Sequence, residues 1–221
     1  MTSGYDQNTA DRLAAAGDEA MRAFARRGEP TDGLARQADA VASACHAMAV
    51  RFHQGGKLIV FGTGGASTDA QHVAVEFVHP VIVGKRALPA ISLTTDVATL
   101  TGVAERDGMA AIFAYQLRYL AAPGDIALGI SATGNDASVL AGLATAAGLG
   151  LLTVALAGGD GGPVAAGAGG RDSPAVDHVL LAGSGDPRVV KEMHVTMYHL
   201  LWELVHVFLE QPGTLGPGVL T

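Results

Sequence analysis

The sequence predicts an α/β domain with a doubly wound parallel sheet, and three features support this fold class. From Lys57 onward, five short apolar runs alternate with helical patterns, which is the element order of a parallel sheet with crossover helices. The runs are continuously apolar rather than alternating, as expected for strands covered on both faces. Glycine accounts for 30 of the 221 residues, and small residues allow helices to pack closely on a sheet.

The chain begins with two helical patterns rather than with a strand. Apolar residues at helical spacing predict a first helix over about Thr9–Arg27 and a second over about Thr31–His53. A Gly-Glu-Pro break at residues 28–30 separates them. We expect this pair, assigned to residues 1–55, to pack on the domain and on partner subunits.

Residues 56–211 form the predicted α/β domain, and residues 212–221 are predicted to be a flexible tail. The expected strands are KLIVFG (57–62), ALPAISL (87–93), DIALGIS (125–131), LLTVALAG (151–158) and DHVLLAG (177–183). Helical patterns are expected over about Ser67–Phe77, Asp96–Leu120 in one or two pieces, Asp136–Ala147 and Pro187–Leu209.

The composition argues against several classes of partner. The formal net charge is −7, from 14 basic and 21 acidic side chains, so we expect neither direct nucleic-acid binding nor a membrane partner. Cys45 is the single cysteine and cannot form an intrachain disulfide, which favours a reduced, cytoplasmic setting. We expect that the N-terminus is no signal peptide and that the longest apolar stretch is too short to span a bilayer.

Two polar corners follow predicted strands, where open α/β sheets bind their ligands. The first, GTGGAS at residues 62–67, fits neither the dinucleotide fingerprint nor a Walker A loop. It is either a turn that presents backbone N–H groups to a ligand or a purely structural turn. The second, Ser131 to Asn135, offers hydroxyls at a helix start, which suits an anion; ordinary N-capping would explain it as well.

Three polar side chains are candidates for acid–base or metal chemistry. His72 and Glu76 are four residues apart and share one helix face, either as functional groups or as solvated neighbours. His199 lies in the apolar context MYHLLWELV on the last helix, where a hydrogen-bonded core histidine is the alternative.

Five segments in order resemble those of SIS-domain proteins. They are GTGGASTDAQHVAVEF, ISLTTDVATLT, GISATGNDASV, LLTVALAGGDGG and KEMHVTMYHLL. The likeness is greatest to the phosphoheptose (sedoheptulose 7-phosphate) isomerases and to their non-enzymatic relatives, the bacterial initiator-associating proteins. It covers about residues 10–210. The resemblance implies a flavodoxin-like parallel sheet flanked by helices and a homotetramer with active sites between subunits.

The resemblance also implies roles for individual residues. Glu76 and His199 match the acid–base residues, and His72 joins them as a zinc ligand in relatives that bind zinc. Substrate contacts are implied for Thr63, Gly64, Gly65, Thr95, Asp96, Ser131, Ala132, Thr133, Asp136 and Lys191. Interconverting a ketose and an aldose phosphate through an enediol needs a base at the carbon acid and a partner at the oxygen, which a carboxylate and an imidazole supply. Zinc would add charge stabilisation.

The sequence departs from the family pattern at residues that would face phosphate. Ala66 stands where the family has a serine, and Ala132 where it has a threonine. Pro80 stands where it has a phosphate-binding arginine, and Lys85 or Arg86 would have to compensate from the following loop.

Asp136 stands where the family has a serine that donates to phosphate. Two unit charges about 4 Å apart repel by roughly 4 kcal/mol at an effective dielectric constant near 20. An aspartate in the first turn of a helix is nevertheless favourable by itself. We therefore hypothesise that Asp136 partly fills the anion site and displaces phosphate; the rival hypothesis is that it turns outward or pairs with a lysine.

Lys191 stands where the family has a glutamine that touches substrate and metal. A protonated ammonium group cannot ligate a metal, and beside Glu76 it would form a salt bridge. We hypothesise that Lys191 takes the position of zinc, so that no cofactor is required, while zinc at His72, Glu76 and His199 is the alternative.

The leading hypothesis is an isomerase acting on a seven- or eight-carbon sugar phosphate. The second hypothesis, favoured by the altered phosphate loop, is a non-catalytic SIS tetramer that binds a sugar or a protein. A third is an isomerase whose substrate lacks phosphate at that end.

Overall fold

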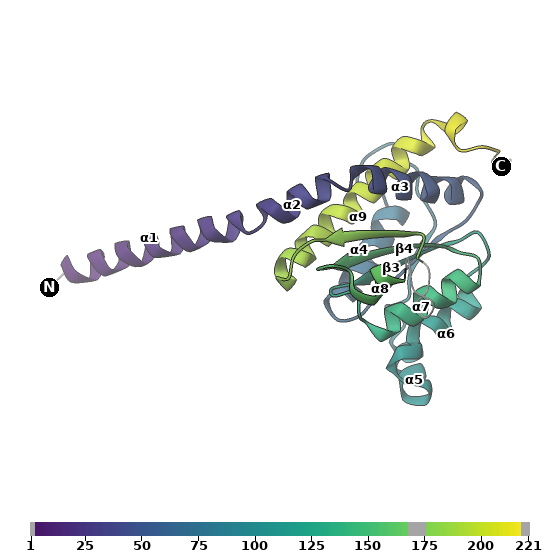
Figure 1. Ribbon diagram of the computed structural model, residues 1–221, viewed down its shortest axis with the longest axis horizontal. Coiled ribbons are helices and arrows are strands. Elements are labelled where there is room, and N and C mark those ends of the chain that lie inside the picture. The colour runs from purple at the N-terminus through teal and green to yellow at the C-terminus, as the bar shows by residue number, and fades with distance from the viewer. Residues whose placement is uncertain (1–2, 168–175, 218–221) are drawn as a thin grey trace.

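The computed structural model describes residues 3–167 and 176–217 and contains one parallel five-stranded sheet (Figure 1). Its strand order is β2-β1-β3-β4-β5, which is the flavodoxin-like order. The strands are β1 (Leu58–Gly62), β2 (Ala90–Ser92), β3 (Ile126–Ser131), β4 (Leu152–Gly158) and β5 (His178–Ala182). All five predicted strands and the predicted fold class are therefore confirmed.

The helices follow the predicted pattern with local differences. They are α1 (Ser3–Ala25), α2 (Gly28–Ala35), α3 (Ala38–His53), α4 (Gly65–Val78), α5 (Val97–Asp107), α6 (Ile112–Leu120), α7 (Ala137–Gly148), α8 (Gly162–Ala166) and α9 (Pro187–Leu209), with 3-10 turns at Met109–Ala111 and Pro212–Thr214. The segment predicted over 96–120 is divided at Gly108, whose φ of 86° ends α5. The five-residue α8 was not predicted, because its glycine-rich sequence carries no helical period.

The sheet is buried on both faces, as the continuous apolar strands require. Leu58 and Val60 of β1 face one core with α3, α4 and α9. Ile59 and Phe61 face the other with α5, α6 and α7, where the Phe61 and Phe113 rings lie 5.2 Å apart. Helices α4 and α7 cover opposite faces of the sheet, and both begin at the edge where β1 and β3 end (Figure 1).

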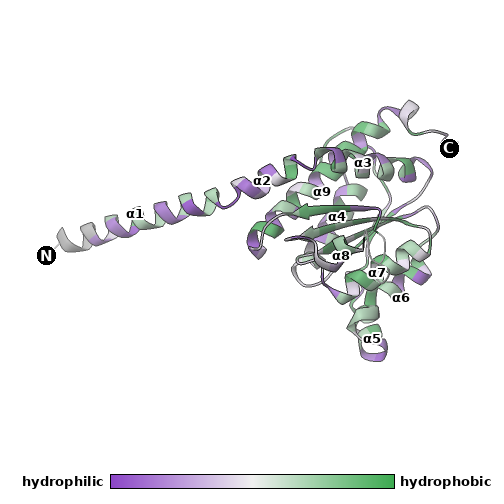
Figure 2. Ribbon diagram, viewed as in Figure 1, coloured by the Kyte–Doolittle hydropathy of each residue, from purple (hydrophilic) through white to green (hydrophobic). Residues whose placement is uncertain are grey.

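The N-terminal region differs from its prediction. Turns at residues 26–27 and 36–37 divide the expected helical pair into three helices. Helix α3 packs on α9 as expected, whereas α1 projects away from the domain (Figure 1). Leu13, Met21 and Phe24 of α1 are 68%, 71% and 72% exposed, and apolar segments are visible along this helix in Figure 2. In the single chain α1 therefore does not pack on the domain.

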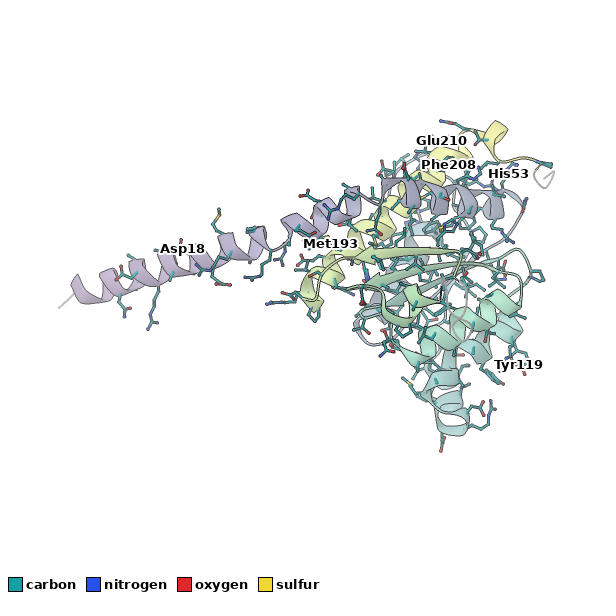
Figure 3. The ribbon with its side chains drawn as sticks, viewed as in Figure 1. Asp18, His53, Tyr119, Met193, Phe208 and Glu210 are labelled. Carbon is teal, nitrogen blue, oxygen red and sulfur yellow. The ribbon has the colours of Figure 1, made fainter. Side chains whose placement is uncertain are left out.

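Polar contacts join the turn between α1 and α2 and the start of α2 to α9. Arg27 pairs with Glu192 of α9 at 2.6 Å, and Thr31 of α2 lies 3.9 Å from the sulfur of Met193 (Figure 3). Both contacts lie after Ala25, the last residue of α1, where this helix leaves the domain.

The start of the segment predicted as a flexible tail packs on the domain. Leu215 is buried, and the Thr214 carbonyl accepts a hydrogen bond from His46 Nε2 at 3.0 Å. The His46 ring meets Phe208 edge-on at 5.3 Å, near the end of α9 (Figure 3). Residues 218–221 of the predicted tail lie outside the described residues. Within the described ranges, no helix has both the length and the apolar character needed to cross a membrane.

Candidate active site

The two polar corners meet at the end of the sheet. Thr63 follows β1 and Asp136 begins α7 after β3, and Thr63 Oγ1 donates to Asp136 Oδ1 at 3.1 Å although 73 residues separate them. Neighbouring parallel strands bring the corners together because their carboxyl ends lie on one edge. Both corners therefore belong to one crevice at the switch point of the sheet.

The β3–α7 loop is closed by its own carboxylate. Asp136 is the N-cap residue of α7, yet its side chain accepts no hydrogen bond from a backbone N–H of that helix. It accepts instead from the hydroxyls of Thr63 and Ser131. Ser131 Oγ in turn accepts from the Gly134 N–H at 2.8 Å. The two hydroxyls that would serve an external anion are thus used by an internal one.

Gly134 fixes the backbone of this loop. Its φ is +69°, and a Cβ there would lie 1.9 Å from the carbonyl oxygen of Gly161. The β3–α7 loop therefore packs directly on the turn before α8, and no side chain fits between them.

A second polar cluster joins α4 to α9. His72 Nε2 lies 3.3 Å from Glu76 Oε1 and 3.3 Å from His199 Nε2. His199 Nε2 lies 4.0 Å from the same Glu76 oxygen. His72 and Glu76 share a helix face, as predicted, and the packing of α9 on α4 brings in His199. His199 is 46% exposed, so the alternative of a core histidine is wrong, and its ring converges with His72 and Glu76.

The surroundings of this cluster hold its geometry. Trp202 Nε1 donates to the Glu76 carbonyl oxygen at 3.0 Å. The Tyr198 ring lies 5.5 Å from the His72 ring and 4.8 Å from the His199 ring. Burial, with smaller contributions from Asp69 and Glu76, raises the pKa of Tyr198 to about 12, so its phenol stays protonated at neutral pH.

The cluster also fits a metal ion. One ligand atom from each of His72, Glu76 and His199 lies within 4.8 Å of the others. Two imidazoles and one carboxylate are a donor set of catalytic zinc sites, which keep a further position open. The two histidines are 44% and 46% exposed, so one side of the cluster is accessible.

Lys191 lies elsewhere than predicted. Its Nζ is 2.7 Å from Asp69 Oδ1 and donates to the Gly65 carbonyl at 2.7 Å and to Thr68 Oγ1 at 3.1 Å. The predicted salt bridge with Glu76 is wrong, because Lys191 precedes His199 by two turns of α9 and so meets the start of α4. Sequence reasoning missed Asp69; its position one turn before His72 on the same helix was the available signal.

The remaining predicted residues line separate cavities. Thr95 and Asp96 line one of about 520 Å³ beside Tyr115. Asp96 caps α5 by accepting from the Thr99 N–H at 3.1 Å and from its hydroxyl at 2.6 Å, and these bonds lower the pKa of its carboxyl. Thr133 lies apart from Thr95 and Asp96, in a smaller cavity between the β3–α7 loop and Gly159.

Three further cavities separate the first corner from the acid–base pair. Thr63, Gly65, Ala132 and Lys191 line one of about 450 Å³, and Gly64 and Thr63 border another of about 220 Å³. Glu76 and His199 line a different cavity of about 360 Å³, together with Lys85, which pairs with Glu210.

The first corner and the acid–base pair are well separated along α4. At 1.5 Å per residue, Glu76 lies about 16 Å along the helix axis from Gly65. The structure thus brings together the groups within each region, but in a single chain it leaves the two regions at different cavities.

Comparison with known proteins gives a consistent set of relatives. A family model described as SIS domain matches residues 30–158. The chain is 40% identical over 181 residues to the phosphoheptose isomerase of Solidesulfovibrio magneticus, covering 81% of this chain and 84% of that protein. It is 38% identical over 158 residues to the phosphoheptose isomerase of Aquifex aeolicus, covering 72% and 78%.

Solved structures agree with these relatives. A phosphoheptose isomerase from Francisella tularensis superposes with a TM-score of 0.78 at 30% identity, covering 87% of this chain and 98% of that one. The phosphoheptose isomerase of Neisseria gonorrhoeae gives a TM-score of 0.71 at 28% identity, covering 89% and 98%.

Proposed function

This chain belongs to the SIS-domain family, and we propose that it is a sugar-phosphate isomerase of the phosphoheptose isomerase type. The convergence of His72, Glu76 and His199 from two helices carries the proposal. Relatives named phosphoheptose isomerase at 40% and 38% identity support the same reaction class.

In this proposal the reaction interconverts a ketose and an aldose through an enediol. Glu76 is the base that removes the proton from the carbon beside the carbonyl group, and it returns a proton to the neighbouring carbon. His199 is the partner group that protonates and deprotonates the oxygens of the substrate. His72, within 3.3 Å of both groups, holds them in register.

Zinc fits the same three side chains. His72, Glu76 and His199 would hold it, and it would stabilise negative charge on the enediolate oxygens. Lys191 does not occupy this position, because its ammonium group is bound to Asp69. The acid–base pair is the part that the reaction requires, and metal is an addition to it.

The anion end of the substrate is bound weakly in this proposal. Asp136 already accepts the hydroxyl hydrogens of Thr63 and Ser131, so a phosphate there must compete with a carboxylate. The same observation favours a second candidate function, a non-catalytic SIS protein that binds a sugar or a protein.

We also propose that the active protein is a homotetramer with sites between subunits. The separation of about 16 Å between the first corner and Glu76 is long for one sugar phosphate, so a neighbouring copy would have to complete each site. Exposed apolar residues suit such contacts, among them Val81, Ile82 and Val83 next to α4, and Phe24 on α1.

The test is product formation from sedoheptulose 7-phosphate. Purified protein is incubated with this ketose phosphate, and the anomeric proton of an aldose phosphate is followed by NMR. Appearance of the aldose signal supports the isomerase, and its absence from folded protein at high concentration favours the non-catalytic alternative.

A further inference from the structure

The cavity of about 450 Å³ at the start of α4 and α9 holds buried polar groups that the proposed chemistry does not use. Besides Thr63 and Lys191, its lining includes Asp69 of α4 and His194 of α9, which are only 3% and 2% exposed. Burying polar side chains costs free energy unless their atoms are hydrogen-bonded. Each of these two residues nevertheless has one atom without a hydrogen-bond partner among the described residues, Asp69 Oδ2 and His194 Nε2.

Asp69 presents a bare acceptor. Its Oδ1 lies 2.7 Å from Lys191 Nζ. The ammonium group donates its other two hydrogens to the Gly65 carbonyl and to Thr68 Oγ1. Lys191 thus neutralises the charge of Asp69 and has no hydrogen left for Oδ2. A carboxylate oxygen in this position accepts hydrogen bonds and cannot donate them.

His194 presents a second acceptor. Its ring is hydrogen-bonded to the backbone of Ala157, and burial lowers the pKa of the imidazole, which keeps it neutral. The hydrogen bond with Ala157 acts in the opposite direction to burial and raises the pKa of the ring, as a bond to a carbonyl oxygen does. The ring nitrogen in this bond is therefore the donor. In a neutral imidazole the other nitrogen carries a lone pair, so the unpartnered Nε2 is an acceptor.

We propose that Asp69 and His194 are a pair of acceptors for two hydroxyl groups of the sugar. This inference rests on the proposed function only in taking the ligand to be a sugar. Two unpartnered acceptors on residues that line one cavity call for a ligand with two donors, and neighbouring hydroxyls of a sugar chain supply them. A cation is disfavoured, because Lys191 already balances the charge of Asp69.

The pair gives selectivity for hydroxyl groups rather than general affinity. A site whose buried polar groups must be satisfied rejects an analogue that lacks the matching hydroxyl far more strongly than an apolar pocket rejects a missing methylene. Asp69 and His194 are therefore assigned as substrate-positioning residues, separate from the acid–base pair.

The experiment measures sugar binding by calorimetry for Asp69→Asn and His194→Asn. The asparagine at 69 keeps an oxygen for Lys191 but replaces the free acceptor with a donor. The asparagine at 194 keeps a donor for Ala157 but has no atom at the Nε2 position. With sedoheptulose 7-phosphate we expect the dissociation constant to rise about tenfold to a hundredfold in each variant, as for loss of a hydrogen bond to a buried or charged partner.

Two matched controls come from buried residues whose side-chain polar atoms all have a hydrogen-bond partner among the described residues. Asp125 is 4% exposed, and its oxygens accept from the Lys57 N–H and Nζ and from the Ala122 N–H. His206 is 2% exposed, and its two ring nitrogens lie 2.8 and 2.9 Å from the Trp202 and Arg86 carbonyls. Asp125→Asn and His206→Asn should lower the melting temperature and leave sugar affinity unchanged.

Monodeoxy analogues of the same sugar phosphate identify the hydroxyls. For the analogue that lacks the hydroxyl bound by Asp69, the affinity of wild type should fall by as much as the substitution Asp69→Asn lowers the affinity for the full sugar. The Asp69→Asn variant should bind this analogue and the full sugar equally well. Affinities within twofold of wild type for both variants would overturn the inference, as would a wild type that binds no sugar phosphate at millimolar concentration. A wild type that shows this coupling but forms no aldose would keep the inference and remove the proposed isomerase.

Discussion

The α4–α9 cluster and the β3–α7 loop contain similar polar groups but differ in whether those groups are accessible to a ligand. In the cluster, His72, Glu76 and His199 converge with two imidazoles nearly half exposed, so their reactive atoms can reach a substrate. In the loop, Asp136 takes up the hydroxyls of Thr63 and Ser131. The difference shows that the polar groups of the cluster are accessible to a substrate, whereas those of the loop are hydrogen-bonded to one another.

Removing the base Glu76 from the accessible α4–α9 cluster should have the largest effect. Glu76→Gln should lower kcat/KM for isomerisation about 10²–10⁴-fold, because an amide cannot take up the carbon-bound proton. Steady-state kinetics measures it. Glu203, an exposed glutamate bordering the same cavity, provides the control, since Glu203→Gln should keep full activity. Equal losses in both variants would contradict a specific role for Glu76.

A change in the backbone of the β3–α7 loop should have the second largest effect. Gly134→Ala places a Cβ at φ +69° and 1.9 Å from the Gly161 carbonyl, which should cost about 3 kcal/mol or more of unfolding free energy. Denaturant unfolding measures the loss. In Gly148→Ala the added methyl group meets open space, so this helix substitution should be neutral or slightly stabilising. A Gly134 variant as stable as wild type would show that the loop is not rigidly held.

Zinc addition sharpens the comparison by testing whether the cluster is open to a ligand. Zinc at a hundred times its dissociation constant should stabilise the protein by about 2.7 kcal/mol, seen as a rise in melting temperature of several degrees. His72→Ala should abolish the rise, and His53→Ala on α3 should keep it. A rise of equal size in the His72 variant would place the metal elsewhere.

Opening the closed loop should give the smallest of these effects. Asp136→Ser removes the carboxylate and frees the Thr63 and Ser131 hydroxyls, so inorganic phosphate should bind about tenfold more tightly. Calorimetry measures the change, with Asp39→Ser on α3 as the charge-matched control. Identical phosphate binding by wild type and Asp136→Ser would show that the carboxylate does not displace the anion.

The elements of the fold could be predicted from the sequence because their signals are local. Continuous apolar runs indicated strands buried on both faces, and α9 was predicted with the bounds that the structure shows, Pro187–Leu209. The direction of α1 could not be predicted, since its apolar residues are exposed and contacts such as the ion pair of Arg27 with Glu192 join residues far apart in the chain.

The site was predictable only in part, because its decisive contacts join residues far apart in the chain. The helical spacing of His72 and Glu76 indicated a shared face, but the meeting with His199 depends on how α9 packs. Lys191 was assigned to the wrong carboxylate, because spacing alone does not show which turn of α4 it meets. His194 had no spacing signal, and its role is suggested only by its burial and its unpartnered nitrogen.

Deuterium uptake tests the central claim, that the open cluster removes a proton from carbon, most directly. The protein is incubated with sedoheptulose 7-phosphate in deuterated water, and label at the carbons beside the carbonyl group is followed by NMR. Uptake by wild type that disappears in Glu76→Gln is the result we predict. Absence of uptake in wild type, or uptake that persists unchanged in Glu76→Gln, would contradict it.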